Sequence, residues 1–438
     1  MNKGLKRILE LLDENTFQET AIEDSGQGII TGTGKIHGKK VCVYAHDPEI
    51  SAGAMSEAMT TKISNLLDHA ISTNVPFIAL NESAGAKIQD GVSALAGLGE
   101  IFKRQISACG TIPQISVCFG SCAGGAVYSS ALSDFTIMVR DSSYMYLTGP
   151  SVVKTATGEV TDHELLGGSS VHGSRSGVAQ FVAENEEEAL NTVRNLLEYL
   201  DSSAKRVGDP KFPCEGIMDI VPDEPSRSYN MLDLIECIAD SGSILEVHKD
   251  WAKNIITTFA RIAGHAVGIV ANQPRYLAGA LDSKASRKAA RFIDICNSFR
   301  LPIITFVDVP GFLCGSEHEQ EGIIEHGAAL LKAYGKASVQ KISITLRKSY
   351  GGAHIAMCCK QLAGSIAFAW PHAELAVMGK TGAGKILHDT DSEPKDSSVS
   401  HALKEGYIDE IISPEDTRNR IIQILDSINN HIKEHETE

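Results

Sequence analysis

The 438-residue sequence contains no run of 18 apolar residues, no cluster of basic residues and no CxxC pair. The first absence argues against a membrane-spanning helix. The second, with a formal charge of −15, argues against a nucleic-acid or anionic membrane partner. The third argues against a zinc ribbon or a thioredoxin-like centre. Without a signal-peptide pattern, the ten cysteines are expected to be reduced thiols in a cytoplasmic protein.

The sequence also contains an internal repeat. Gly124-Gly125 recurs 227 positions later as Gly351-Gly352. Seven earlier residues recur 226 positions later with the same identity: Gly38, Val41, Pro48, Gly53, Lys62, Pro76 and Gly85. We therefore predict two copies of one domain, at residues 1–209 and 229–438, joined by a linker at 210–228 that holds four of the 14 prolines.

Each copy alternates strand and helix patterns. Two short β-runs with a turn precede a helix pattern, and two continuous apolar strands follow. In the first copy these strands are expected at 75–80 and 113–119, each leading through a glycine-containing turn into a helix. Strands that alternate with helices predict an α/β fold with the strands buried on both faces.

The Gly-Gly pairs lie where an α/β sheet normally binds its ligands, beyond the carboxyl ends of the strands. Glycine lets a ligand approach the backbone, and the first N–H groups of a helix lack intrahelical partners. Such groups form an oxyanion hole or a phosphate site. The alternative is a tight turn that only packs closely, and the repetition of the pair favours a function.

Three other patterns are weaker indications of a functional site. Ser121-Cys122 lacks the G-x-S-x-G nucleophile pattern. The Gly379–Lys385 spacing is that of a P-loop, but Ile386 stands where Mg²⁺ binding needs Ser or Thr, so we interpret it as a look-alike. A possible metal cluster is interpreted as helix caps and solvated surface, and no metal is expected; its residues are His318, Glu321, Glu325 and His326.

Long ordered motifs, spread from about Gly26 to Arg418, resemble one family: the carboxyltransferase (β) subunits of biotin-dependent acyl-CoA carboxylases, propionyl-CoA carboxylase type. The motifs include "GAKIQDGVSALAGLGEIFKR", "GSCAGGAVYSSALSDFTIMV", "ANQPRYLAGALDSKASRKAARFI", "FVDVPGFL" and "RKSYGGAHIAM". The stretch between Met378 and Ser400 is shorter than in longer members of the family. The identity of the acyl group is therefore left open, and an acyl group carried on a protein is one alternative.

The resemblance implies two tandem crotonase-like β-β-α spiral domains and a hexamer built as a trimer of dimers. It implies transfer of a carboxyl group from carboxybiotin, carried on a separate protein, to an acyl-CoA of the acetyl- or propionyl-CoA class. Biotin carboxylase and biotin carboxyl carrier protein would be the partners. The same subunit could run in reverse in a decarboxylase or transcarboxylase, where a membrane pump is a possible partner. A non-catalytic assembly subunit is the alternative of another class.

The resemblance also implies residue roles. N–H groups of Gly124 and Gly125 would hold the thioester oxygen of an enolate, and those of Gly352 and Ala353 the ureido oxygen of biotin, whose nitrogen takes the α-proton. Further acyl-side residues would be Ser83, Ala84, Gly85, Ala86, Lys87, Ala123 and Ile355, and further biotin-side residues Gly351 and His354. A Gly125→Val substitution is expected to abolish transfer without unfolding the protein.

Overall fold

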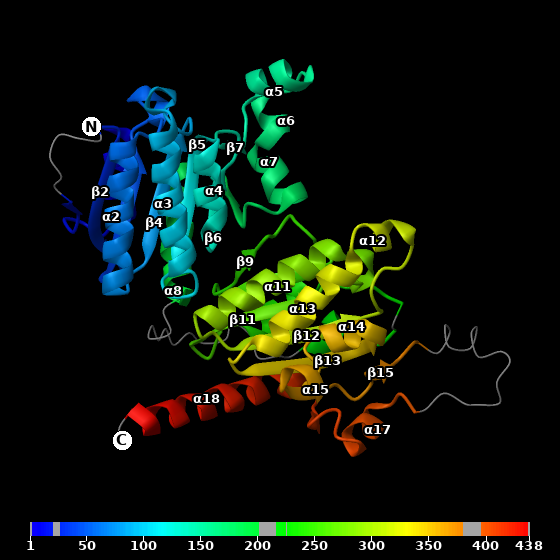
Figure 1. The fold of residues 1–438 in the computed structure, drawn as a ribbon. Helices are drawn as coiled ribbons and strands as arrows, with labels where there is room; N and C mark the ends of the chain where they lie inside the picture. Colours follow the sequence, from blue (N-terminus) through cyan, green and yellow to red (C-terminus); the bar gives the residue numbers. More distant parts are fainter. Residues whose placement is uncertain (1, 21–26, 201–215, 225, 380–395, 437–438) are drawn as a thin grey trace. The chain divides into compact units, whose positions relative to one another are not determined.

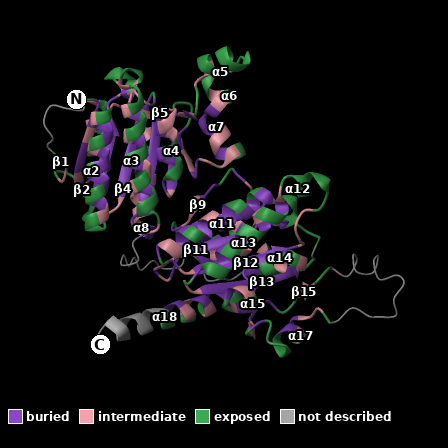
Figure 2. Ribbon diagram, in the orientation of Figure 1, coloured by how far each residue is buried: buried purple, intermediate pink, exposed green. Residues whose placement is uncertain are grey.

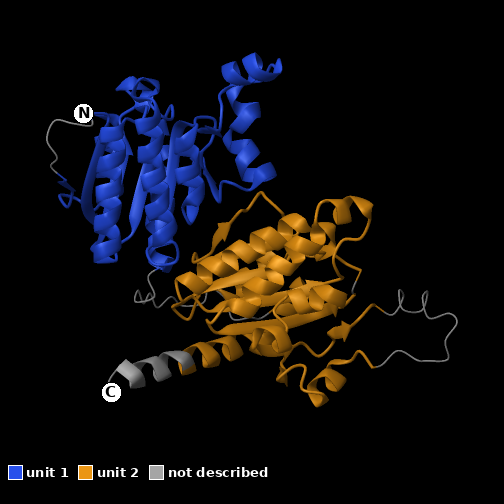
Figure 3. Cartoon of the chain, viewed as in Figure 1, with its two compact units in different colours: residues 1–200 blue, residues 201–438 orange. Residues whose placement is uncertain are grey.

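The computed structural model describes residues 2–20, 27–200, 216–224, 226–379 and 396–436. The chain divides into two compact units, residues 1–200 and 201–438 (Figure 3). Each unit is an α/β domain built on one eight-stranded sheet (Figure 1). The look-alike P-loop at 379–385 lies almost wholly outside the described residues.

The first unit has the strand order β1-β2-β3-β4-β5-β6-β8, with β7 paired to β5. The β2–β3 hairpin is antiparallel, and the later neighbours are parallel. The strands are β1 Gln18–Glu19, β2 Ile29–Ile36, β3 Lys39–His46, β4 Phe77–Ser83, β5 Gln114–Ala123, β6 Phe135–Val139, β7 Tyr144–Tyr146 and β8 Phe181–Ala183.

Helices cover both faces of this sheet. The α2 and α3 helices share a core with one face, and α1 is in contact with β3 and α8 with β6. The helices are α1 Lys3–Leu11, α2 Glu57–Thr73, α3 Val92–Ala108, α4 Gly125–Leu132, α5 Pro150–Thr157, α6 His163–Gly167, α7 Ser169–Val171 and α8 Glu186–Leu200.

The second unit repeats this plan strand for strand, in the order β9-β10-β11-β12-β13-β14-β16 with β15 paired to β13. The hairpin is again antiparallel and the later pairs parallel. The strands are β9 Leu245–Val247, β10 Ile255–Ile262, β11 His265–Asn272, β12 Ile303–Val309, β13 Lys341–Tyr350, β14 Ile366–Ala369, β15 Glu374–Ala376 and β16 Glu410–Ile411. The repeat seen in the sequence is therefore a structural duplication.

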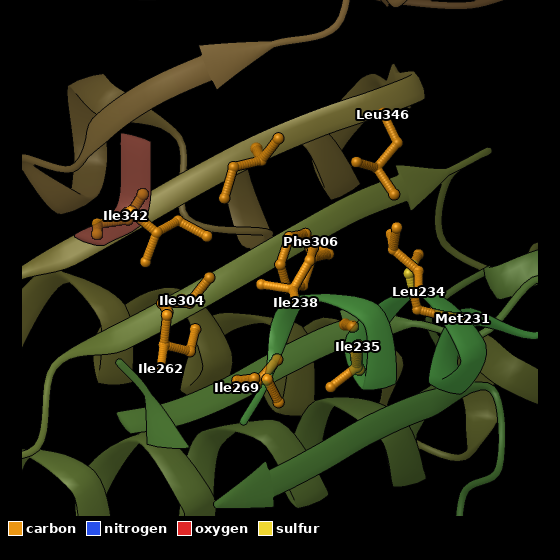
Figure 4. Close-up of a cluster of buried hydrophobic side chains, with 14 of the residues drawn as sticks. Met231, Leu234, Ile235, Ile238, Ile262, Ile269, Ile304, Phe306, Ile342 and Leu346 are labelled. Carbon is orange, nitrogen blue, oxygen red and sulfur yellow. The ribbon is translucent and has the colours of Figure 1, made fainter. Parts of the chain in front are cut away.

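Because successive side chains of a strand point to opposite faces, the strands of the second sheet contribute to a core on each face. Ile304 and Phe306 face the cluster formed with α10 and α18 (Figure 4). Thr305 faces α13, where its hydroxyl meets the Tyr334 hydroxyl at 2.8 Å. Figure 2 shows the strands as buried bands between helices with exposed outer faces. The helices are α9 Ile217–Ile220, α10 Met231–Ile238, α11 Ser283–Ser298, α12 Ser316–Gln320, α13 Ile323–Lys336, α14 Gly351–Ala356, α15 Lys360–Ala363, α17 Val399–Lys404 and α18 Thr417–Glu436.

The strand before the first Gly-Gly turn is longer than predicted. β5 was expected to end at residue 119 but continues to Ala123, because its last residues pair with β7 after a register shift opposite Asn81 and Ser83. The same shift occurs in β12 between Val307 and Val309, and there β13 continues into pairing with β15. A pairing with a three-residue strand has no periodic signal in the sequence.

The segment predicted as a linker at 210–228 is only partly described. Its described part contains the short helix α9 and contributes fully buried Ile217 and nearly buried Val221 to the core of the second unit. The described part of this segment is therefore packed into the second unit. Residues 201–215 lie outside the described part of the chain.

Lys288 on α11 is 1% exposed, and its ammonium group fills a cage of backbone carbonyls. The acceptors are the oxygens of His248 at 3.0 Å, Trp251 at 2.9 Å, Ala252 at 3.4 Å and Ile255 at 2.7 Å. These hydrogen bonds hold the loop between β9 and β10 against α11.

Replacing Lys288 with Met should lower the free energy of unfolding by about 3 kcal/mol, because it leaves several buried carbonyls without a donor. The repeat-equivalent Lys62→Met is the matched control, since Lys62 is only partly buried, and it should change that energy by less than about 1 kcal/mol. Denaturant unfolding measures both. Equal losses for the two variants would contradict the role of the cage.

Candidate active site

The first Gly-Gly turn joins β5 directly to α4. Gly124 has φ 58° and ψ −135°, a conformation that only glycine adopts readily. Its N–H donates to the Tyr146 carbonyl of β7 at 3.1 Å. The Gly124 N–H is thus already engaged, which differs from its expected role as a donor to the thioester oxygen. Gly124 shapes the turn.

The donors available at this turn are the N–H groups that follow Gly124. Val127 donates to the Gly124 carbonyl at 3.2 Å. Gly125 and Ala126 open the helix, where N–H groups have no intrahelical acceptor, and the helix dipole adds partial positive charge. Gly125 and Ala126 therefore present the N–H groups at this turn, and Ala126 is a residue that was not predicted from the sequence.

The structure brings the predicted acyl-side loop, residues 83–87, against this turn. A Cβ on Gly85 would lie 2.8 Å from the Ala123 carbonyl oxygen, so only glycine permits the approach. Ser83 is 1% exposed; its hydroxyl donates to the Gly53 carbonyl at 2.7 Å and accepts from the Gly85 N–H at 3.1 Å. Ser83 thus holds the loop in shape.

The remaining loop residues are more accessible. Ala84 is exposed, and Ala86 and Lys87 are partly exposed. The Lys87 ammonium lies 4.0 Å from the Asp90 carboxylate, at the long limit for an ion pair. These side chains are placed to line a site at the turn, and Lys87 supplies a positive charge beside it.

The second Gly-Gly turn joins β13 to α14, and its first glycine, Gly351, has the same φ of 58° as Gly124. A Cβ on Gly352 would meet nothing nearer than the Phe312 ring at 3.9 Å, so a ligand atom can approach the backbone there. Gly352 and Ala353 occupy the positions equivalent to Gly125 and Ala126, as the 227-residue offset requires.

Phe312 was missed from the sequence, although the offset of 226 pairs it with Ala86. The pairing is structural: Met55 bridges to Ala86 as Leu281 bridges to Phe312. The first turn is therefore flanked by a methyl group and the second by an aromatic ring. The two halves share this backbone pairing and differ in the side chain beside the turn.

His354 and Ile355 follow the second turn on α14. The His354 Nδ1 atom lies 2.9 Å from the Ser349 hydroxyl, and burial lowers the pKa of His354. The imidazole is therefore neutral at pH 7 and can give or take a hydrogen bond at the turn. Ile355 is 46% exposed and belongs to the same surface as the exposed Gly352.

The described residues contain no group of three or more His, Cys, Asp or Glu side chains placed to hold a metal ion. His318 and Glu321, from the cluster considered above, are 4.0 Å apart. In the same part of the chain, no helix has the length and apolar character needed to cross a membrane.

The chain belongs to the carboxyl transferase domain family, whose model matches residues 9–436. The sequence is 45% identical to the carboxyltransferase subunit of propionyl-CoA carboxylase from Haloferax mediterranei, over 96% of this chain and 89% of that protein. It is 42% identical to methylmalonyl-CoA decarboxylase subunit alpha from Veillonella parvula, over 96% and 88%. The resemblance inferred from motifs is confirmed, and the chain is a carboxyltransferase of propionyl-CoA carboxylase type.

Solved structures agree with this assignment. The transcarboxylase 12S hexamer with hydrolysed methylmalonyl-coenzyme A bound superposes with a TM-score of 0.93 and 38% identity, over 97% of this chain and 88% of that one. The expected α/β fold of two tandem crotonase-like domains is thereby confirmed.

The geometry of the two turns predicts how glycine substitutions change the free energy of unfolding. Gly124→Ala and Gly351→Ala should each lower the free energy of unfolding by about 1–3 kcal/mol, because alanine is strained at φ 58°. Gly352→Ala should cost less than about 1 kcal/mol, since its φ is not positive and the site has room for a Cβ. Denaturant unfolding of the three variants measures this order, and equal costs would contradict the turn geometry.

Proposed function

We propose that this carboxyltransferase moves a carboxyl group between biotin and an acyl-CoA thioester, with the acyl half-site in the first unit and the biotin half-site in the second. The observation that carries the proposal is the pair of equivalent strand-to-helix turns, each with glycine at φ 58° and helix N–H groups directly after it. Two such turns match a reaction that develops negative charge on two oxygens.

On the acyl side, the N–H groups of Gly125 and Ala126 would donate to the thioester oxygen as the α-carbon loses its proton. Those hydrogen bonds strengthen as the oxygen becomes an enolate, which lowers the barrier. Exposed Ala84 and partly exposed Lys87 line the approach. The transcarboxylase relative holds a hydrolysed methylmalonyl-CoA, which supports an acyl-CoA of the propionyl class for this chain.

On the biotin side, Gly352 and Ala353 would donate to the ureido oxygen, and the open space at Gly352 fits such a ligand. Biotin on its carrier protein supplies the ureido group that holds the transferable carboxyl group. Phe312 and His354 flank the turn, one with an apolar ring and the other with a neutral imidazole. Backbone N–H groups are the donors common to both turns, so backbone geometry dominates this chemistry.

The proposal also covers the oligomeric state, the partner proteins and the direction of carboxyl transfer. The hexamer of the transcarboxylase relative supports a hexamer here, with a biotin carboxylase and a biotin carboxyl carrier protein as partners. The decarboxylase relative from Veillonella parvula supports the reverse direction as a second candidate. Both turns keep their glycines and their geometry, which argues against a non-catalytic assembly subunit.

The proposal is tested with purified protein, methylmalonyl-CoA and free biotin, by following biotin-dependent loss of the carboxyl group from the thioester. Gly352→Val should fold, because its Cβ has room, and should lower kcat by about 100-fold by blocking the approach to the backbone. The Gly125→Val variant is less suitable, since a Cβ there lies 2.5 Å from the Leu98 side chain in the core.

Gly335→Val on α13 is the control, because its Cβ would make only an ordinary contact, 3.6 Å from Leu362. It should keep the wild-type rate. Unchanged kcat in Gly352→Val would refute the assignment of the second turn. A panel of acyl-CoA and carrier-protein thioesters in the same assay identifies the preferred acyl group, and the proposal predicts propionyl-class CoA thioesters.

A further inference from the structure

Two carboxylates stand at equivalent positions directly before the two half-sites. Glu82 near the end of β4 and Asp308 near the end of β12 are 226 residues apart. Each is bound by an arginine: Arg7 donates to Glu82 at 2.6 Å, and Arg347 donates to Asp308 at 2.9 Å from two nitrogens. Both arginine side chains are at most 6% exposed.

The first arginine comes from α1, far from the site in sequence. Beyond Glu82, the Arg7 guanidinium donates to Glu186 on α8 at 2.9 and 2.6 Å. It also lies 4.1 Å from the centre of the Phe119 ring on β5. Arg7 therefore joins the N-terminal helix to the strands β4 and β5, whose ends form the acyl-side turn.

The second arginine comes from the strand itself. Position 347 on β13 is equivalent to position 120 on β5. Gly120 has no room for a side chain, since a Cβ there would lie 2.7–2.8 Å from Glu82 side-chain atoms. The first half thus leaves the strand position empty and brings its arginine from α1, whereas the second half puts the arginine on the strand. Both routes place a buried guanidinium on the carboxylate at the equivalent position of its own half.

The biotin-side pair is part of a larger cluster. Asp308 is 0% exposed and also accepts from the Lys348 ammonium at 2.8 Å and the Tyr229 hydroxyl at 3.0 Å. From Nη1, Arg347 donates to three backbone carbonyls of the segment that precedes α10, those of Pro222, Glu224 and Arg227. Arg347 therefore fixes the end of β13 four residues before Gly351.

The main chain of both acidic residues packs closely against a glycine. The Glu82 main-chain carbonyl oxygen would lie 2.1 Å from a Cβ on Gly53, and that of Asp308 2.9 Å from one on Gly279, so only glycine fits beside either strand. Ser83, the residue after Glu82, holds the loop that packs against the first turn.

We propose that Arg7 is a positioning residue for the acyl-side turn and Arg347 for the biotin-side turn. The inference rests on the function proposed above. By this proposal the N-terminal helix α1 supports the acyl half-site through Arg7, although α1 contains none of the residues that would touch substrate.

The test compares Arg7→Lys with Arg347→Lys in the transfer assay with methylmalonyl-CoA and free biotin. Lysine keeps the charge but loses the planar fork that binds two partners at once. Arg7→Lys should raise KM for methylmalonyl-CoA about tenfold and leave KM for free biotin within about twofold. Arg347→Lys should show the opposite pattern. Glu82→Asp and Asp308→Glu, which keep the charge but change the reach, should follow their partners.

Arg104→Lys is the control, because Arg104 is also paired with two carboxylates, Asp68 and Glu100, but lies on the exposed side of α3. It should leave both KM values unchanged. A merely structural role would change both KM values alike or neither, and either result overturns the inference while wild-type transfer upholds the proposed function. Absence of biotin-dependent transfer by the wild-type protein overturns both.

Discussion

Both half-sites depend on one backbone constraint, a glycine at φ 58° where a long strand turns into a short helix. At this angle the chain reverses without a side chain, and the next N–H groups point away from the helix they begin. The surrounding structure keeps each turn in place: the β7 carbonyl of Tyr146 holds Gly124, and Gly85 packs against the Ala123 carbonyl. The register shifts in β4–β5 and β12–β13 carry both strands to these junctions.

Duplication explains why one chain carries two such turns, and divergence explains how they differ. Strand order and pairing are the same in the two sheets. The side chains around the turns have changed, with Ala86 against Phe312 and Gly120 against Arg347. The shared backbone gives both halves N–H groups at the start of a helix, while the substituted side chains give each half a different shape and a different internal support.

The fold class and the positions of both turns could be predicted from the sequence, because glycines, prolines and apolar runs indicate directly what the backbone must do. The recurring Gly-Gly pairs located both turns, and the strand and helix patterns gave the α/β class. Contacts between distant residues had no such signal. The engagement of the Gly124 N–H depends on the three-residue strand β7, and the Arg7–Glu82 pair joins residues 75 positions apart. Side-chain support of this kind follows from packing, which periodicity does not encode.

The central claim is that backbone N–H groups of two equivalent turns bind the two reacting oxygens. A crystal structure of the protein with propionyl-CoA and biotin tests it most directly. The account predicts the thioester oxygen about 3 Å from the Gly125 nitrogen and the ureido oxygen at a similar distance from the Gly352 nitrogen. Both ligands bound elsewhere, with neither oxygen at these nitrogens, would contradict it.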